Sequence, residues 1–217
     1  MRKLIVTTQK SFDKIDEIAK DLKTFFIVGC GLCATECQTG GEKEVLAMIK
    51  KLEDVKKQVT GYVIVEGGCD QRQVKLEFRR HKRAIADAEA LLILSCGVGV
   101  QTAMELSKKV CIPGLNTRFI GTTERIGRFY ERCRACGDCT LFETGGICPI
   151  TRCPKGLLNG PCGGHMDGKC EVDQEKDCAW ILIYQRLLKL GQLDKMTNIR
   201  KPRDYRLTTK PQAVVWR

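Results

Sequence analysis

A stretch rich in cysteine, glycine and proline, from Cys133 to Cys178, constrains this chain more than any other. It opens with a C-x2-C-x2-C run and continues with single cysteines, and its eight thiols are Cys133, Cys136, Cys139, Cys148, Cys153, Cys162, Cys170 and Cys178. Three thiols at i, i+3 and i+6 let one tight loop present sulfurs to neighbouring corners of a cubane cluster. The stretch therefore favours a loop-dominated module that binds iron–sulfur clusters.

Cysteine makes up 14 of the 217 residues, and a disulfide scaffold is the first alternative. Such scaffolds are mostly short secreted domains. Here the opening Met-Arg-Lys is followed by only three apolar residues, which is too short for the apolar region of a signal peptide. The composition therefore favours metal or cluster binding in a reducing cytoplasm.

Zinc is the second alternative for the cysteine-rich segment. Zinc ribbons usually supply four ligands from two separated C-x2-C pairs, whereas this segment has one fused triplet and no second pair. The two histidines, His81 and His165, are too few for repeated Cys2His2 sites. We expect [4Fe–4S] clusters, two or three in the whole chain, with zinc possible in one site of the 133–178 segment.

The first part of the chain predicts an α/β fold. Four short apolar runs without polar alternation are typical of buried parallel strands, and they cover residues 25–28, 62–65, 91–94 and 110–113. Helical patterns separate them, including residues 71–88 and 101–109. Strand–helix alternation with short connections predicts a small doubly wound parallel sheet.

Cysteines follow three of these runs directly. Cys30, Cys33 and Cys37 form a C-x2-C-x3-C turn after the first run, while Cys69 and Cys96 follow the second and third. Functional groups of doubly wound sheets gather outside the carboxyl ends of the strands. We therefore expect one cluster held by Cys30, Cys33, Cys37 and Cys96, with Cys69 as the alternative ligand. Cys111, inside the fourth run, fits a buried thiol.

The chain is expected to fall into three parts. Residues 1–120 form the α/β domain, residues 121–195 the cysteine-rich module, and residues 196–217 a basic extended tail. Within the module a helix is expected over residues 179–190, and its inward stripe is Trp180, Ile181, Tyr184, Leu187 and Leu188.

Charge and hydropathy narrow the classes of partner. The net charge is +11, but each [4Fe–4S]2+ cluster with four thiolates would carry about −2, and no nucleic-acid-binding motif is present. No apolar run reaches the roughly 20 residues of a membrane helix. Gly97-Val98-Gly99 does not complete a phosphate-binding motif, and no Ser/His/Asp set or carboxylate pair stands out. We therefore expect neither nucleic-acid binding, nor a membrane span, nor a catalytic site of its own.

Several segments resemble a known family. They are Gly29-Cys-Gly-Leu-Cys-Ala-Thr-Glu-Cys, Ser95-Cys-Gly-Val-Gly-Val-Gln, Thr144-Gly-Gly-Ile-Cys-Pro and Asn159-Gly-Pro-Cys-Gly-Gly. Through them the chain resembles the small cysteine-rich iron–sulfur subunit of the methylenetetrahydrofolate reductase of acetogens, also described as a methylenetetrahydrofolate reductase C-terminal domain. The resemblance covers nearly the whole chain.

The resemblance implies a partner subunit that binds FMN and reduces methylene- to methyl-tetrahydrofolate in the Wood–Ljungdahl pathway. It makes this chain a non-catalytic, cytoplasmic electron-transfer subunit without a flavin, which accepts electrons from a redox donor and passes them to the partner's flavin. Two alternatives stay open: a zinc-stabilised docking subunit of the same complex, and an accessory protein of corrinoid-linked methyl transfer.

Overall fold

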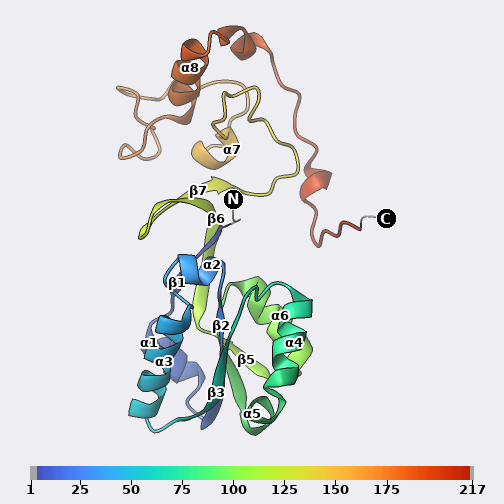
Figure 1. Cartoon of the computed structure of the whole chain (residues 1–217). Coiled ribbons are helices and arrows are strands. Elements are labelled where there is room, and N and C mark those ends of the chain that lie inside the picture. The colour runs from blue at the N-terminus through green and yellow to red at the C-terminus, as the bar shows by residue number, and fades with distance from the viewer. Residues whose placement is uncertain (1–3, 216–217) are drawn as a thin grey trace. The chain divides into compact units, whose positions relative to one another are not determined.

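The computed structural model describes residues 4–215, and the chain divides into two compact units. The first unit ends at Tyr130 and the second begins at Glu131 (Figure 1). This division lies beyond the boundary expected after residue 120, because residues 115–133 form a hairpin. Each unit has its own hydrophobic core.

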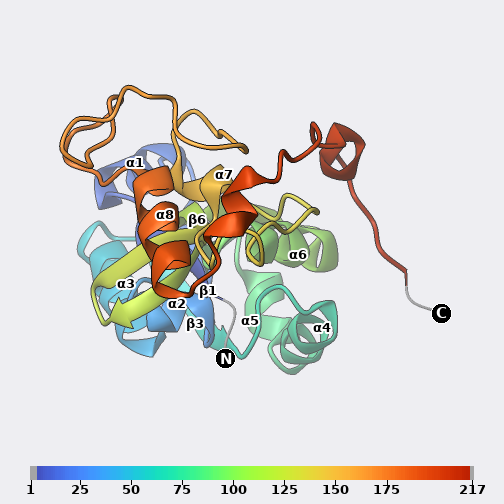
Figure 2. The ribbon, with the colours of Figure 1, turned by 90° about the horizontal axis from the view of Figure 1, so that it is seen from above.

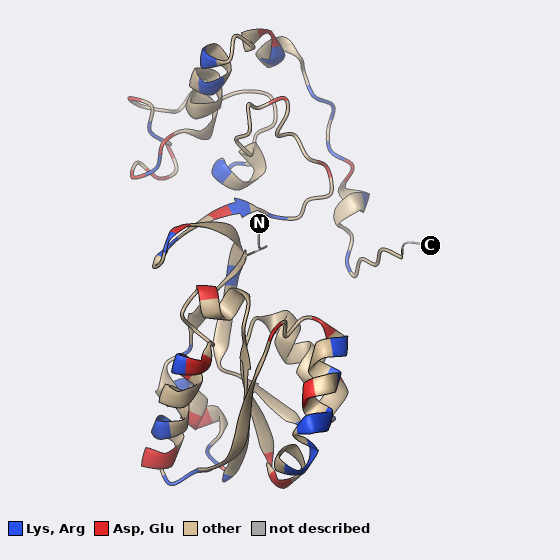
Figure 3. Cartoon of the chain, viewed as in Figure 1, with Lys and Arg blue, Asp and Glu red and all other residues tan. Residues whose placement is uncertain are grey.

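A parallel four-stranded sheet forms the centre of the first unit, which confirms the predicted α/β class. Its strand order is β3-β2-β4-β5, and the strands are β2 (Thr24–Cys30), β3 (Gln58–Val65), β4 (Ala90–Leu94) and β5 (Val110–Pro113). None of the four strands carries a charged residue, and in this part of the chain the helices and loops around the sheet carry charged residues (Figure 3). The four apolar runs of the sequence are therefore the four buried parallel strands.

Helices cover both faces of this sheet, as a doubly wound fold requires (Figures 1 and 2). On one face α1 (Phe12–Ile18) and α3 (Glu42–Asp54) bury Ile15, Met48 and Leu52 against Phe25, Ile27 and Leu92. The other face is covered by α4 (Gln71–Arg80), α5 (Lys82–Asp87) and α6 (Gly97–Ser107). There Val74, Phe78, Ile85 and Ala103 pack against Phe26, Leu91 and Ile93.

Two helices differ from their predicted bounds. The helix expected over residues 71–88 is interrupted at His81, where α4 ends and α5 begins. The helix expected over residues 101–109 begins earlier, at Gly97, since the backbone N–H of Gly97 finds an acceptor in Thr117 Oγ1 at 2.8 Å. The Gly97–Gly99 turn is thus the first turn of α6 and directly follows Cys96.

A second, antiparallel sheet lies mostly in the first unit, and its last strand continues into the second. It has the order β1-β6-β7 and consists of β1 (Leu4–Gln9), β6 (Leu115–Arg125) and β7 (Arg128–Cys133). β1 pairs with β6 in antiparallel register. The sequence patterns did not indicate strands between residues 115 and 133, where the structure has the β6–β7 hairpin.

The second unit is loop-dominated, as expected of its glycine, proline and cysteine content. Its helical elements are α7 (Pro149–Arg152), α8 (Ala179–Lys189) and the 3-10 turns η1 (Leu193–Thr197) and η2 (Tyr205–Thr208). The predicted C-terminal helix is confirmed as α8, but its inward stripe is only partly correct. Trp180 and Leu187 are buried together with Ile183, whereas Tyr184 and Leu188 are exposed.

Candidate cysteine sites

The parallel sheet brings the cysteine-bearing turns of the first unit to one edge. β2 pairs with both β3 and β4, so the turns that carry Cys30, Cys69 and Cys96 follow three adjacent strands. In the register Cys30 lies level with the last residue of β3, and Gly29 with the last residue of β4. The chain leaves β2 for β3 on one side and then reaches β4 on the other, so this edge is the topological switch point where such sheets bind their ligands.

Cys33 joins this edge through the short helix α2 (Cys33–Glu36), which follows β2. Burial raises the pKa of the Cys33 thiol, and the backbone of Ile5 partly opposes the shift. Negative charge on three neighbouring thiols raises it further, and these are Cys30, Cys96 and Cys69. The Cys33 sulfur is therefore within electrostatic range of these three thiols.

Cys69 is the exposed member of this set. Burial of its sulfur raises the pKa of Cys69, and the charges of Cys96, Cys30 and Asp70 add to the shift. The sequence made Cys69 the alternative to Cys96 as the fourth ligand, and in the structure Cys69 lies within electrostatic range of both Cys96 and Cys30.

Cys37 has different surroundings. It is buried in a small apolar cluster with Leu4 and Val6 of β1, and its sulfur donates a hydrogen bond to the Ile5 carbonyl at 3.8 Å. Burial raises the pKa of Cys37, and hydrogen bonds from Thr7 partly offset the rise. One turn of α2 thus turns the Cys37 side chain toward β1.

Two buried polar atoms beside this edge have no hydrogen-bond partner among the described residues. They are Ser95 Oγ, directly before Cys96, and Gln73 Oε1 on α4. A Cβ on Gly68 would lie 2.9 Å from Ser95 Oγ, and a Cβ on Gly67 would lie 3.1 Å from Gln73 Oε1. Both atoms therefore adjoin the turn that carries Cys69. Sequence reasoning missed Ser95, although its position next to Cys96 was a usable signal.

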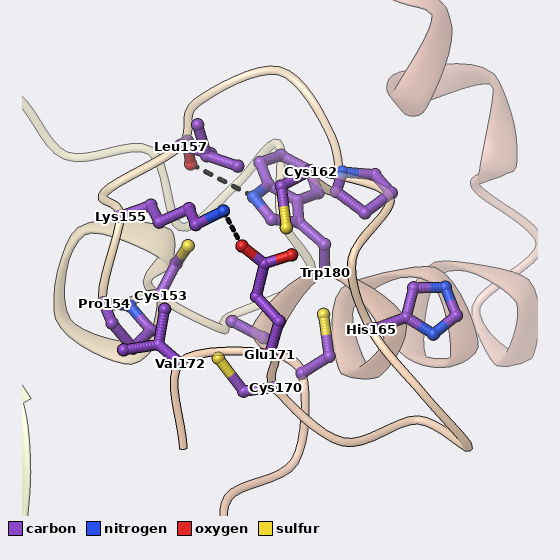
Figure 4. Close-up of a pocket in the computed structure, with 13 residues that line it drawn as sticks. Cys153, Pro154, Lys155, Leu157, Cys162, His165, Cys170, Glu171, Val172 and Trp180 are labelled. Carbon is purple, nitrogen blue, oxygen red and sulfur yellow. Dashed lines mark hydrogen bonds and ion pairs between the residues drawn. The ribbon is translucent and has the colours of Figure 1, made fainter. Parts of the chain in front are cut away.

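In the second unit one pocket gathers four of the eight cysteines (Figure 4). They come from separate loops and from the start of α8, and they are Cys153, Cys162, Cys170 and Cys178. Trp180 closes one wall, and its Nε1 donates a hydrogen bond to the Leu157 carbonyl at 3.1 Å. The hydrogen bond ties the loop between Cys153 and Cys162 to α8.

The same pocket contains polar groups that act on its thiols. Lys155 and Glu171 form an ion pair among the sulfurs (Figure 4). A backbone hydrogen bond from Gly164 lowers the pKa of Cys162, and the charge of Lys155 adds to this effect. His165 also lines the pocket, and its Nδ1 is buried without a hydrogen-bond partner in the described chain.

The Cys133–Cys139 triplet starts at the last residue of β7 and continues into a loop. The loop turns at Ala135 and Gly137, whose φ angles are 51° and 77°. Burial raises the pKa of Cys136, but the Arg203 guanidinium and the Asp138 backbone outweigh it, so the pKa lies below the usual value. Cys148 directly precedes α7, and its sulfur accepts a hydrogen bond from Thr151 Oγ1 at 3.4 Å.

Within residues 4–215, no three Cys, His, Asp or Glu side chains already form a metal-coordinating group. The thiols are near one another without being closed into a coordination shell. A bound metal would close such a shell, because metal binding and local folding are coupled. Cluster binding thus stays a prediction, and so does the choice of ligands.

Comparison with known families concerns the part of the chain that holds the second unit. Residues 112–206 match a family described as methylene-tetrahydrofolate reductase C terminal. This segment is a domain related to methylenetetrahydrofolate reductase. The reductase-related segment contains all eight cysteines from Cys133 to Cys178, whereas Cys30, Cys33, Cys69 and Cys96 lie outside it.

The other comparisons give no relative. No curated protein and no solved structure matches the chain. None of the helices in the described part of the chain is long and apolar enough to cross a membrane. The reductase relationship therefore rests on the matched segment, and the sheet edge of the first unit is interpreted from its geometry.

Proposed function

We propose that this chain is the iron–sulfur electron-transfer subunit of a methylenetetrahydrofolate reductase complex. In this proposal it takes electrons from a redox partner and passes them to the flavin of a catalytic subunit, which reduces methylene- to methyl-tetrahydrofolate. It works in the cytoplasm, in the Wood–Ljungdahl pathway of acetogens, and has no substrate-reducing site of its own. The relationship of residues 112–206 to the reductase supports the choice of complex.

The observation that carries the electron-transfer role is the set of four thiols at the switch point of the parallel sheet. Cys30, Cys69 and Cys96 come from three adjacent strands, and Cys33 from the helix that follows β2. Zinc ribbons supply their ligands as two local C-x2-C pairs, and this set contains only one such pair, Cys30 and Cys33. Iron–sulfur clusters are held by four thiolates, which is the donor set that gathers here.

The remaining cysteines sort into two further sets under this proposal. The pocket beside Trp180 would hold one cluster through Cys153, Cys162, Cys170 and Cys178. The triplet Cys133, Cys136 and Cys139 would hold another, with Cys148 as the fourth ligand by elimination. Two thiols, Cys37 and Cys111, are left as buried structural groups.

The residues around the sheet edge fit such a group. A cluster bound there would supply reversible one-electron chemistry. The buried Ser95 hydroxyl has a proton to donate and no acceptor in the described chain, so it can hydrogen-bond to a bound sulfur. Apolar side chains, among them Leu94 and Val65, are fully buried beneath the edge and keep water from its inner side.

Metal analysis of anaerobically purified protein tests this proposal. We expect roughly eight to twelve irons per chain with matching sulfide, and a brown absorbance that dithionite bleaches. Reoxidation of the reduced chain by the flavoprotein subunit would complete the relay. Colourless protein with zinc and little iron would contradict the electron-transfer role.

One observation favours a second candidate, a zinc-stabilised docking subunit of the same complex. The pocket of the second unit collects four cysteines, and His165 Nδ1 is buried there without a partner in the described chain. Four cysteines, or three cysteines and His165, are ligand sets that structural zinc ions use. Zinc at one equivalent beside about four or eight irons would assign this pocket to zinc and leave the relay to the other sets.

A further inference from the structure

The C-terminal residues 198–208, here called the strap, lie along the loop that carries the Cys133–Cys139 triplet. Arg203 Nη2 donates a hydrogen bond to the Cys136 carbonyl at 2.7 Å. Arg200 pairs with Asp138, with 2.6 Å between Nη2 and Oδ2. The strap is thus bonded to the backbone of Cys136 and to the side chain of Asp138, which lies between Cys136 and Cys139.

Packing and a second anchor hold the strap in place. Leu207 lies against Gly137, where an added Cβ would come within 3.2 Å of the Leu207 Cβ. Asn159 holds the backbone of Arg200 from both sides, accepting from its N–H at 2.8 Å and donating to its carbonyl at 3.0 Å. The strap was expected to be an extended tail, and its contacts instead place it on the cysteine module.

The guanidinium of Arg203 has unused hydrogen-bonding capacity at this position. Its Nη1 is buried and has no hydrogen-bond partner among the described residues. Leaving a charged donor unpaired in a buried position costs free energy, so such a group usually has a partner. The surrounding loop presents three sulfurs, and thiolates or sulfides are acceptors for this donor.

We propose that Arg203 is a positioning residue for the group bound by the Cys133–Cys139 loop. One nitrogen of its guanidinium holds the loop by the Cys136 carbonyl, and the other donates a hydrogen bond to a sulfur of the bound group. Arginine suits this task because its planar fork offers two donors in fixed directions, whereas lysine is a point charge. The inference rests on the proposed function, since it takes the bound group to be an iron–sulfur cluster.

The consequence concerns the reduction potential of one cluster. Hydrogen bonds to cluster sulfurs and nearby positive charge stabilise the reduced, more negative form and so raise the potential. Loss of Arg203 should therefore lower the potential of the cluster on this loop and leave those of the other clusters in place. A residue that only holds the backbone would change how much cluster is bound, but not the potential of what remains.

The experiment compares four full-length proteins purified without oxygen: wild type, R203Q, R203K and R206Q. Arg206 is the matched control, because it lies three residues further along the strap, pairs with Asp204 and has a side chain that is 90% exposed. Iron and sulfide content is measured first, and each protein is then titrated potentiometrically with electron paramagnetic resonance detection.

We expect one component of the R203Q titration to move to lower potential, with a smaller shift in R203K and none in R206Q. If R203Q loses the iron of one cluster, the potential measured in R203K tests the inference instead, since R203K keeps the positive charge. Unchanged potentials in an iron-loaded R203K, or in R203Q, would overturn the inference while leaving the proposed function intact. A wild-type protein without reducible iron would overturn the proposed function and this inference with it.

Discussion

A Cβ on Gly99 would overlap the hydroxyl oxygen of Ser95, so the first turn of α6 fits closely around this side chain. Gly68 approaches the same hydroxyl from the turn after β3. Ser95 is 2% exposed, and its Oγ has no hydrogen-bond partner in the described chain. The two glycines therefore hold an unsatisfied donor beside Cys69 and Cys96.

The Ser95→Ala substitution should act in opposite directions with and without metal. In chelator-treated protein it removes a buried, unsatisfied hydroxyl, so the free energy of unfolding should rise by about 1 kcal/mol. In the metal-loaded protein it removes a donor to the bound group, and the protein should become less stable than the loaded wild type. Thermal unfolding of S95A and wild type, each with and without metal, measures both changes in stability.

Ser107→Ala is the control for this pair of measurements. Ser107 Oγ accepts a hydrogen bond from the Lys109 backbone at 3.2 Å, so its loss should destabilise both forms alike. An S95A protein that is destabilised in both forms would show that the Ser95 hydroxyl has a protein partner and no role toward a bound group.

Gly40 fixes the turn after the first cysteines against the sheet. A Cβ there would overlap the carbonyl oxygen of Leu94, which is backbone and cannot move aside as a flexible side chain could. Gly40→Ala should therefore lower the free energy of unfolding by about 1–3 kcal/mol. It should also reduce the metal bound at the sheet edge, because Leu94 precedes the turn that carries Cys96.

Gly31 provides the comparison within the same turn. The nearest atom to a Cβ on Gly31 is Glu66 Cα at 3.5 Å, which is ordinary van der Waals contact. In chelator-treated protein Gly31→Ala should unfold within a few degrees of wild type. Equal losses of stability in G31A and G40A would contradict the assigned role of the Leu94 carbonyl.

The parallel sheet and its cysteine edge were predictable from the sequence for a physical reason. Strands buried on both faces must be apolar throughout, so they stand out as uninterrupted runs such as residues 25–28 and 91–94. Cysteines placed directly after such runs must meet at the carboxyl edge once neighbouring strands pair in parallel. The β6–β7 hairpin escaped detection because its residues are mostly half-buried or exposed and carry several charges.

The partners of individual thiols were not predictable. The C-x2-C-x3-C spacing does not say toward which side α2 turns, and in the structure Cys37 faces β1. Cys69 reaches the other thiols only because β3 is the neighbour of β2. The contact of Arg203 with Cys136 joins residues far apart in the sequence, and no local sequence pattern predicts it.

Serine substitutions should separate Cys69 from Cys37. We predict that Cys69→Ser lowers the iron content by about four irons per chain, because it removes one of the four thiols at the sheet edge. Cys37→Ser should keep the iron, since the Cys37 sulfur is bonded to the Ile5 carbonyl within an apolar cluster. Iron analysis and visible spectra of the two purified variants show which of Cys69 and Cys37 is needed for iron binding.

Cys111→Ser is the control for a buried thiol. Cys111 lies in β5 within the core of the sheet, and its sulfur is 3.9 Å from Ser107 Oγ. This variant should lose stability without losing iron. Loss of iron in C37S together with retention in C69S would restore Cys37 as the fourth ligand and overturn the assignment to Cys69.

Two exposed thiols should differ in the pH at which they react in chelator-treated, reduced protein. The pKa of Cys69 is raised by burial of its sulfur and by the charges of Cys96, Cys30 and Asp70. The pKa of Cys162 is lowered by the Gly164 backbone and by Lys155. Since only the thiolate is alkylated, Cys162 should reach half its maximal rate with iodoacetamide at lower pH than Cys69. Peptide mass spectrometry over a series of pH values measures both rates in one sample.

Two substitutions test the causes separately. Lys155→Gln removes a positive charge from the Cys162 pocket, so the midpoint of Cys162 should move to higher pH while that of Cys69 stays. Cys96→Ser removes a negative charge beside Cys69, so the midpoint of Cys69 should move to lower pH while that of Cys162 stays. If C96S left Cys69 unchanged, the two sulfurs would be too far apart to bind one cluster, which would contradict the proposed sheet-edge site.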